Sequence, residues 1–205
     1  LVLDLQGSKW RLGAVETMEL EAGEKVSFTL DRELTESGLG NGSPSRRLPV
    51  PHPDFFEAAA AGSSKIRLND ARVELEIESA GREYLRCVVR RGGPVASRKG
   101  ISIPGSTYRR EGLLPKDAEI LRRTTGAAGV SYALSYVRDG TEMDTLGRAI
   151  PEGARRIAKI ERPEAVETAV QIGELSDEVW LCRGDLGAEV GGVEMAKMVY
   201  RFSQK

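Results

Sequence analysis

The feature that most constrains the fold is a strand–helix–strand pattern between residues 154 and 189. Two short apolar runs within it each end in charged residues, the first at Lys159–Glu161 and the second at Arg183–Asp185. Between them, residues 163–175 carry apolar side chains at helical spacing. Two strands joined by a helix on this scale form a βαβ unit, so we expect neighbouring parallel strands in one sheet.

A third apolar run extends the pattern. Residues 131–137 (SYALSYV) have the composition of a strand. Ser135, Lys159 and Arg183 are separated by equal steps of 24 residues (159 − 135 and 183 − 159). The equal steps predict comparable positions at the ends of three successive strands. In a (β/α)₈ barrel, the carboxyl ends of the strands carry the active site.

The sequence before residue 131 predicts a β-rich domain inserted into the barrel. Residues 1–5 (LVLDL) indicate a strand with Asp4 near its end, and the glycine turn that follows carries Lys9 and Arg11. Short alternating runs then dominate up to about residue 100. In one of them, at 71–79, apolar residues alternate with glutamates, as on a half-buried strand.

After this β-rich stretch, helical and strand patterns alternate. We expect a helix at 115–123, a strand at 131–137, a helical segment at 141–149, a strand at 154–160, a helix at 163–175, a strand at 179–182 and a last helix at 193–202. A complete barrel needs about 250 residues, which the 205 residues here do not supply. The predicted fold class is therefore α/β, a partial (β/α)₈ barrel with an inserted small all-β, barrel-like domain. The predicted boundaries are 1–12 for the first barrel strand and its exit turn, 13–103 for the inserted β-rich domain, and 104–205 for the partial barrel segment.

Composition excludes several classes of protein. The 30 Lys and Arg residues nearly balance the 31 Asp and Glu residues, so no basic surface for nucleic acid or an anionic membrane is predicted. No apolar stretch approaches the ~20 residues of a membrane-spanning helix. Cys87 and Cys182 lie in separate apolar runs, which favours free thiols and a reducing, cytoplasmic location. Because the chain begins and stops inside patterned segments, we expect a piece of a longer protein.

Two carboxylates are the candidate metal ligands. Glu161 and Asp185 follow strands adjacent in sequence, and neighbouring strands lie about 4.8 Å apart. Such a pair suits Mg²⁺ (or Mn²⁺), which takes oxygen ligands and uses only one or two protein carboxylates. Lys159 and Arg183 stand beside them and suit a polyanionic substrate. The alternative is that these four residues form a structural ring of ion pairs.

A second cationic stretch and several absent motifs bear on nucleotide binding. Arg98 and Lys99 leave the β-rich domain after a Gly-Gly-Pro turn, where they either reach phosphates or are ordinary solvated charges. The chain has neither a P-loop nor a G-x-G-x-x-G turn after a strand, so neither motif holds a nucleotide here. One histidine and two distant cysteines give little support to zinc ligation or a Ser/His/Asp triad.

Several of these stretches resemble the pyruvate kinase family. IAKIERPEAVE followed by VWLCRGDLGAEV resembles the family's K-I-E and A-R-G-D-L-G strand ends. LVLDLQGSKWRLG is similar to its D-x-x-G-P-x-I-R-x-G stretch, and GGPVASRKGISIPG to its G-G-x-L-x-S-[RK]-K-G-[VI]-N-[LI]-P-G stretch. LLPKDAEIL and ALSYVR are similar to L-T-x-K-D and x-S-F-[VI]-R. The motifs occur in the family's order and span nearly the whole chain.

The resemblance implies a (β/α)₈ barrel with a β-rich lid inserted after the third strand and a separate C-terminal domain. It implies transfer of the phosphoryl group of phosphoenolpyruvate to ADP, giving pyruvate and ATP, with Mg²⁺ and usually K⁺. It also implies a homo-oligomer, a tetramer, while the charge balance predicts no nucleic acid or membrane partner. Because strands that complete the family's site precede and follow the matched region, we expect the 205 residues alone to be inactive.

The resemblance also implies roles for individual residues. Glu161 and Asp185 are expected to hold Mg²⁺, and Asp4 to bind K⁺. Lys159 is expected to stabilise the phosphoryl group, with Arg183 beside it as a catalytic residue. The backbone of Gly184 and Asp185 is expected to bind the substrate carboxylate. Arg11 and Lys99 are expected to bind the nucleotide.

Departures from the family pattern keep other functions open. Leu5 replaces the usual Thr, Ser8 replaces Pro, and Trp10 replaces Ile or Val. Residues 69–71 stand where the family's lid has D-D-G, and Gly191-Gly192 stand where it has I-P. These changes motivate a non-catalytic, pyruvate-kinase-like pseudoenzyme or regulatory piece as an alternative. A further alternative is a metal–enolate aldolase or lyase of the same barrel type.

Overall fold

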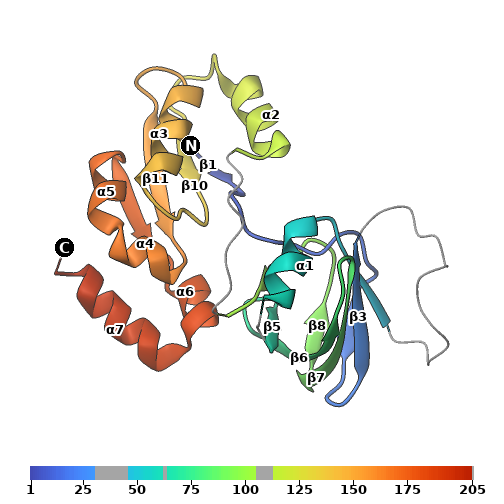
Figure 1. The fold of residues 1–205 in the computed structure, drawn as a ribbon. Coiled ribbons are helices and arrows are strands. Elements are labelled where there is room, and N and C mark those ends of the chain that lie inside the picture. The colour runs from blue at the N-terminus through green and yellow to red at the C-terminus, as the bar shows by residue number, and fades with distance from the viewer. Residues whose placement is uncertain (31–45, 62–63, 105–112, 205) are drawn as a thin grey trace. The chain divides into compact units, whose positions relative to one another are not determined.

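The computed structural model describes residues 1–30, 46–61, 64–104 and 113–204 (Figure 1). The chain divides into two compact units. Unit 1 comprises Leu1–Lys9 and Arg110–Lys205, and unit 2 comprises Trp10–Arg109. The predicted boundaries at 12/13 and 103/104 remain predictions. The described part of the chain contains no helix long and apolar enough to cross a membrane.

Unit 1 is built on a four-stranded parallel sheet in the order β1-β10-β11-β12. Its strands are β1 (Val2–Leu5), β10 (Ser131–Leu134), β11 (Arg155–Ile160) and β12 (Glu178–Leu181). Its helices are α2 (Pro115–Thr124), α3 (Gly140–Ala149), α4 (Pro163–Glu167), α5 (Ala169–Glu174), α6 (Arg183–Val190) and α7 (Gly192–Phe202) (Figure 1). The spatial order of the strands follows the chain, with helices between successive strands after β10, as in a segment of a (β/α) barrel.

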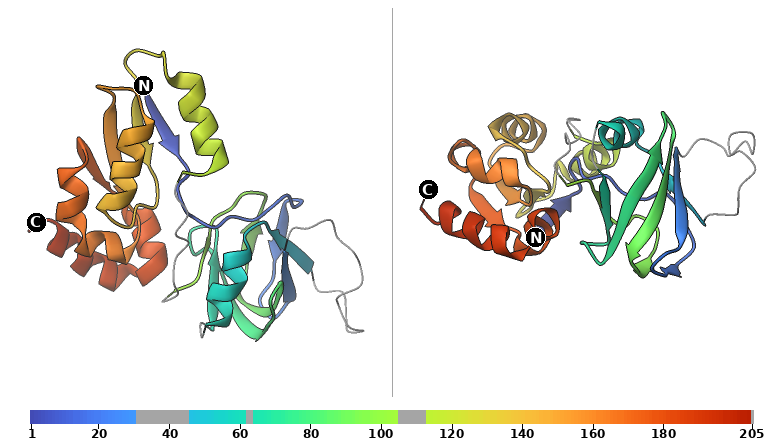
Figure 2. Two further views of the ribbon diagram at one scale, coloured as in Figure 1. Left: turned by 45° about the horizontal axis from the view of Figure 1, so that its top comes forward. Right: turned by 60° about the horizontal axis from the view of Figure 1, so that its bottom comes forward.

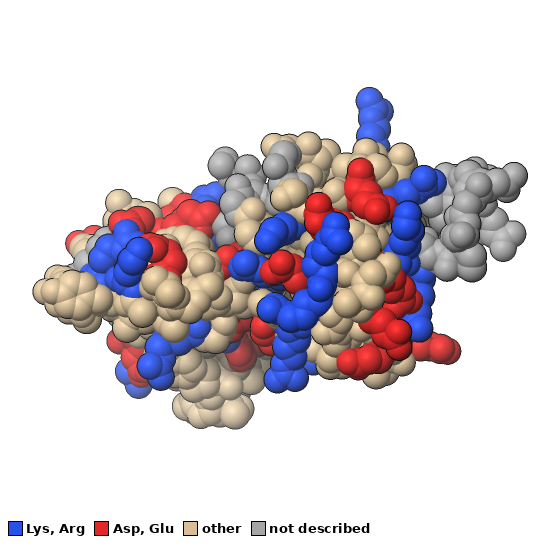
Figure 3. All heavy atoms as spheres, turned by 90° about the horizontal axis from the view of Figure 1, so that it is seen from below, with Lys and Arg blue, Asp and Glu red and all other residues tan. Residues whose placement is uncertain are grey.

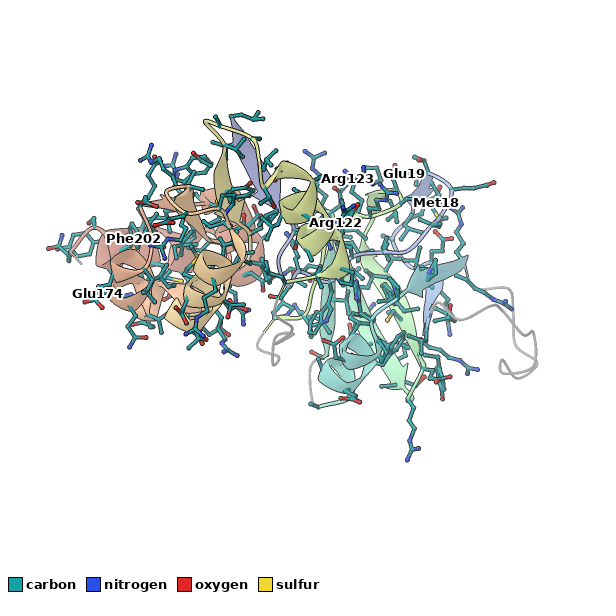
Figure 4. The ribbon with its side chains drawn as sticks, turned by 90° about the horizontal axis from the view of Figure 1, so that it is seen from above. Met18, Glu19, Arg122, Arg123, Glu174 and Phe202 are labelled. Atoms are coloured by element: carbon teal, nitrogen blue, oxygen red, sulfur yellow. The ribbon has the colours of Figure 1, made fainter. Side chains whose placement is uncertain are left out.

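The core of unit 1 lies between this sheet and its helices. Tyr132 and Ala158 from the strands are fully buried with Met143, Val166 and Ile172 from the helices. Burial of strand side chains under the crossover helices explains why the strand sequences are short, nearly continuous apolar runs. On the solvent side of α2, Arg122 and Arg123 both donate to Glu119; the two arginines are labelled in Figure 4.

Unit 2 contains a mixed six-stranded sheet in the order β4-β3-β7-β6-β5-β9, and a separate β2-β8 pair. Its elements are β2 (Met18–Leu20), β3 (Lys25–Leu30), β4 (Arg46–Val50), α1 (Pro53–Ala60), β5 (Lys65–Leu68), β6 (Val73–Ala80), β7 (Tyr84–Arg91), β8 (Gly93–Val95) and β9 (Ile101–Ser102). Figure 2 shows the strongly twisted sheet with α1 against it. Phe55 of α1 packs on Trp10, Phe28 and Phe56, and all four are buried.

The structure confirms the predicted fold class, a partial barrel segment with an inserted β-rich domain. The alternation at 71–79 is also observed, because Val73 and Leu75 are fully buried while Glu74 and Glu76 reach the surface. At 69–71, where the sequence departs from the family's D-D-G, Asn69, Asp70 and Ala71 form a tight turn with φ of 52°, 54° and 60°. Asn69 stabilises this turn by donating its amide to the Pro94 carbonyl at 3.0 Å.

Two predicted elements differ from the structure. The strand expected at 131–137 ends at Leu134, because Tyr136 adopts a left-handed conformation with φ of 62°. The helix expected at 163–175 is interrupted at Thr168, whose hydroxyl donates to the Arg138 carbonyl at 2.8 Å. Figure 4 marks the ends of α5 and α7 at Glu174 and Phe202.

The predicted equal spacing of strand ends is wrong in its second step. Ser131 pairs with Arg155, a step of 24 residues (155 − 131), whereas Ala158 pairs with Val179, a step of 21 (179 − 158). The shorter αβ connection means that Arg183 does not lie in register with Lys159. It begins helix α6 instead, an element that the sequence pattern did not predict.

Candidate active site

Charged side chains gather in unit 1 where the parallel strands end. Asp4 comes from β1, Lys159 from β11, and Glu161 directly follows β11. Ser135 follows β10, in the position next to Lys159 in the register of the two strands. Asp185 lies in the first turn of α6. The topology therefore brings most of the predicted site residues to one edge of the sheet, although the first and last of this cluster are 181 positions apart in the sequence (185 − 4).

The ammonium of Lys159 is the centre of this cluster. It donates to both carboxylate oxygens of Asp4 at 2.9 and 3.1 Å, to Ser135 Oγ at 3.1 Å, and lies 3.1 Å from Glu161 Oε1. These four oxygen atoms belong to three side chains, one for each N–H bond of the ammonium. Burial lowers the pKa of Lys159, but the hydrogen bond to Asp4 and the charge of Glu161 outweigh it and raise the pKa above its usual value. The side chain is therefore a fixed positive charge at neutral pH.

Glu161 is a buried carboxylate, with only 3% of the residue exposed. Its Oε2 accepts the backbone N–H of Tyr136 at 3.1 Å. Burial raises its pKa, and although Lys159 lowers the pKa, the nearby charge of Asp185 raises it again, so the net shift is upward. A carboxylate in this state gains from any further positive charge placed beside it.

The side chain that pairs with Asp185 is not the one that the sequence suggested. Lys9 Nζ lies 2.6 Å from Asp185 Oδ1, and only 8% of Lys9 is exposed. Arg183, which the sequence placed beside Asp185, is exposed on the first turn of α6. The alternative was a structural ring of ion pairs formed by Lys159, Glu161, Arg183 and Asp185. It is wrong in one respect, because Asp185 pairs with Lys9, which is not one of these four residues.

Lys9 is the site residue that sequence reasoning missed. Its position four residues after the end of β1 was a usable signal, because a residue that leaves a strand at its carboxyl end lies near the other strand ends. Nothing in the local sequence, however, links it to a partner 176 residues away.

The start of α6 offers backbone donors. The N–H groups of Arg183, Gly184 and Asp185 belong to the first turn, which has no intrahelical acceptors for them. Cys182 precedes this turn and provides no side-chain cap. Gly184 is exposed, and a Cβ added there meets no atom of the described residues within 4 Å. An anion can therefore approach the helix start closely, where the helix dipole also favours negative charge.

The number of acidic side chains at the strand ends decides how a divalent cation could bind here. Within the described residues, no group of three or more acidic, histidine or cysteine side chains forms a metal cluster. Glu161 and Asp185 are nevertheless close enough for the charge of one to raise the pKa of the other. Two carboxylates are sufficient for Mg²⁺ when water and substrate oxygens complete its shell. Two carboxylates are ligands of the type that magnesium takes, and their joint role in holding it is a proposal.

The two predicted nucleotide-binding residues lie together in unit 2. The Leu12 N–H donates to the Lys99 carbonyl at 3.0 Å, and the backbone of Arg11 forms an isolated antiparallel β-bridge with that of Gly100. The guanidinium of Arg11 donates to the Arg98 carbonyl at 3.1 Å. Figure 3 shows lysines and arginines interspersed with acidic residues on the face it draws, in keeping with the balanced composition.

The two cysteines are free, as predicted; Cys87 is buried and Cys182 is partly buried. Burial raises the pKa of each thiol to about 12, and the charge of Glu161 adds to the shift at Cys182. Since the thiolate is the reactive form, we expect alkylation by iodoacetamide at pH 8 to be about a thousandfold slower than for a free cysteine. Mass spectrometry of the native and urea-unfolded protein tests this; fast native labelling of Cys182 would contradict it.

Comparison with known proteins agrees with this geometry. Residues 1–204 match the family model described as "Pyruvate kinase, barrel domain". The chain belongs to the pyruvate kinase family. It is 34% identical over 189 residues to a pyruvate kinase of Agrobacterium vitis, covering 91% of this chain and 38% of that protein. It is 33% identical over 199 residues to pyruvate kinase of Mycobacterium tuberculosis (strain ATCC 25618 / H37Rv), covering 93% of this chain and 39% of that protein.

The chain thus spans about two fifths of the length of the pyruvate kinases it matches. The predicted family is confirmed, and the match to its barrel domain runs through both the strand ends that form the cluster and the β-rich insertion. The roles of individual residues remain proposals.

Proposed function

We propose that the protein containing this chain transfers the phosphoryl group of phosphoenolpyruvate to ADP, forming pyruvate and ATP. The observation that carries the proposal is the Lys159 ammonium, held by Asp4 and Ser135 and 3.1 Å from the buried carboxylate of Glu161. Phosphoryl transfer needs a positioned cation beside acidic metal ligands, because the reacting group carries negative charge throughout. Membership of the pyruvate kinase family supports this choice of substrate class.

In this proposal, Glu161 and Asp185 hold Mg²⁺ or Mn²⁺, which when bound neutralises charge on the substrate's oxygens. Lys159 stabilises the transferring phosphoryl group through its ammonium. The N–H groups of Gly184 and Asp185 at the start of α6 receive the substrate carboxylate. Arg183 on the same exposed turn adds a positive charge for the anionic substrate.

Further assignments rest on family membership and remain proposals. Arg11 and Lys99 bind the nucleotide phosphates. Asp4 contributes to a K⁺ site, although its carboxylate here accepts hydrogen bonds from Lys159 and Ser135. The complete protein is proposed to be a cytoplasmic homo-oligomer, a tetramer.

The experiment is a coupled assay of pyruvate formation. The product of the complete reading frame is expected to form pyruvate only when phosphoenolpyruvate, ADP and Mg²⁺ are all present. Residues 1–205 alone are expected to form none, because they cover only about two fifths of the length of the related enzymes. Activity of the isolated chain would contradict the second expectation, and an inactive complete product would contradict the first.

A non-catalytic role is the second candidate. The ammonium of Lys9 lies 2.6 Å from Asp185, a proposed metal ligand, and Leu5 and Ser8, in the segment that leads to Lys9, depart from the family pattern. Under this alternative, the complete product binds phosphoenolpyruvate without turnover. The aldolase or lyase alternative is not favoured, because the family match extends from residue 1 to residue 204.

Gly184→Ala tests the proposed substrate contact. The added methyl group contacts none of the described residues, and alanine is the better helix former, so we expect the stability to stay equal or to rise by up to about 1 kcal/mol. The same methyl group obstructs the approach of a carboxylate to the start of α6. The KM for phosphoenolpyruvate is expected to rise by at least about tenfold, which corresponds to one lost hydrogen bond to a charged group. An unchanged KM would remove this contact from the proposal.

A further inference from the structure

Tyr136 lies at the centre of a buried network behind the charged cluster. It is 2% exposed and follows Ser135 at the end of β10. Lys9 Nζ lies 5.4 Å from the centroid of its ring, and the Arg162 guanidinium carbon lies 5.5 Å from the same centroid. Its hydroxyl donates to Glu189 Oε1. One aromatic side chain thus contacts two cations and a carboxylate.

The backbone of Tyr136 also reaches the cluster. Its N–H donates to Glu161 Oε2 at 3.1 Å. This contact depends on the left-handed backbone conformation, φ 62°, which is uncommon for a residue with a large side chain. A strained conformation of this kind persists only where surrounding contacts hold it. The hydroxyl bond to Glu189 and the cations over the ring are such contacts.

Helix α6 connects the two carboxylates involved. Asp185 and Glu189 are four residues apart and therefore project from the same face of the helix. Asp185 pairs with Lys9, and Glu189 accepts the hydroxyl of Tyr136. Since Lys9 lies over the ring of Tyr136, the helix is attached to this side chain at two successive turns.

We propose that Tyr136 is a positioning residue for the carboxylate pair, fixing Glu161 through its backbone N–H and Asp185 through the Lys9 ammonium that rests on its ring. The role of the pair as metal ligands rests on the proposed function. The geometry of Lys9 does not, and it is therefore the quantity to measure. A cation over a desolvated aromatic face is held in place by the ring's negative potential.

The test is amine labelling of the protein with acetic anhydride, without metal or substrate, followed by mass spectrometry. The rate at Lys9 is divided by that at Lys25, whose side chain is 70% exposed. Tyr136→Leu removes the ring, and we expect the relative rate at Lys9 to rise by about tenfold. Tyr136→Phe keeps the ring and loses only the hydroxyl, so we expect an increase of about threefold.

Tyr132→Phe is the matched control. Tyr132 is fully buried in the same strand region, and its hydroxyl bonds to Thr124 Oγ1 at 2.8 Å, on the α2 side of the sheet. We expect it to leave Lys9 labelling unchanged. Lys159 is a second reporter. Its ammonium also contacts Asp4 and Ser135, so we expect loss of positioning to raise its labelling less than that of Lys9, whereas general loosening of unit 1 raises both equally.

Selective labelling of Lys9 in the Tyr136 variants supports the proposal. Equal rises at Lys9 and Lys159, or no rise at Lys9, would overturn it. If Tyr136→Leu does not fold, the result for Tyr136→Phe decides by the same criterion. Because no substrate or metal is present, a failure of the complete product to form pyruvate leaves this result standing, and the two proposals can fail separately.

Discussion

Lys159→Met is expected to lower kcat for pyruvate formation by the complete protein by about 10²- to 10³-fold, the usual effect of removing one preorganised donor from a transition state. The magnitude follows from the position of the ammonium, whose charge is held in place by Asp4, Ser135 and Glu161. Methionine keeps most of the side-chain volume, so the change isolates the charge.

The same substitution removes the ion-pair partner of Glu161, whose side chain is only 4% exposed, and some loss of stability is therefore expected. Circular dichroism and a thermal melt will show whether the variant is folded at the assay temperature. Lys197→Met is the matched control, because Lys197 pairs with Glu194 on the surface of unit 1. A folded Lys159→Met variant with the kcat of the control would refute the role of Lys159.

Gly7→Ala is expected to cost about 3 kcal/mol or more in the free energy of unfolding. Gly7 has a φ of 62°, and a Cβ built there lies 1.9 Å from the Ser135 carbonyl oxygen. Because this oxygen is backbone, the strand end of β10 must move to accommodate the methyl group. Movement would also strain the contact between the Gly7 N–H and the Asp117 carboxylate at 3.1 Å.

Gly129→Ala separates the cost of a left-handed alanine from the cost of the overlap with the Ser135 carbonyl oxygen. Gly129 has a similar φ of 69° in the same unit, but an added Cβ meets no atom within 4 Å in the part of the chain that the structure describes. Its substitution is expected to cost only about 1 kcal/mol, the penalty for a left-handed alanine. Urea unfolding of both variants provides the measurement. Equal losses of stability would show that the close approach of Gly7 to Ser135 is not required.

Much of the fold was predictable because its signals are local. The strands that end at Leu5, Ile160 and Leu181 coincide with short apolar runs, and the helix beginning at Pro115 has proline in its first turn. The β-rich domain was predictable from alternation, as at Val73 and Leu75. Glu161 and Lys159 were found for the same reason, since a strand end is visible in sequence and parallel topology brings such ends together.

The remaining features depend on contacts between distant segments. Lys9 and Asp185 are 176 residues apart, and no periodic pattern connects them. Asp117 is fully buried because its carboxylate accepts the N–H groups of Gln6 and Gly7, more than 100 residues away. The left-handed conformation of Tyr136 shortened a strand that the sequence extended to residue 137. In each case tertiary contacts override the local preference.

The central claim, that Glu161 and Asp185 together hold a divalent cation, is tested most directly by Mn²⁺ binding measured by electron paramagnetic resonance. The account predicts that Glu161→Gln and Asp185→Asn each weaken binding by at least about tenfold, the loss of one charged ligand. Asp144→Asn, which alters a surface ion pair with Arg148, is predicted to leave the Kd unchanged. Equal affinity in all four proteins, the unsubstituted chain included, would contradict the account.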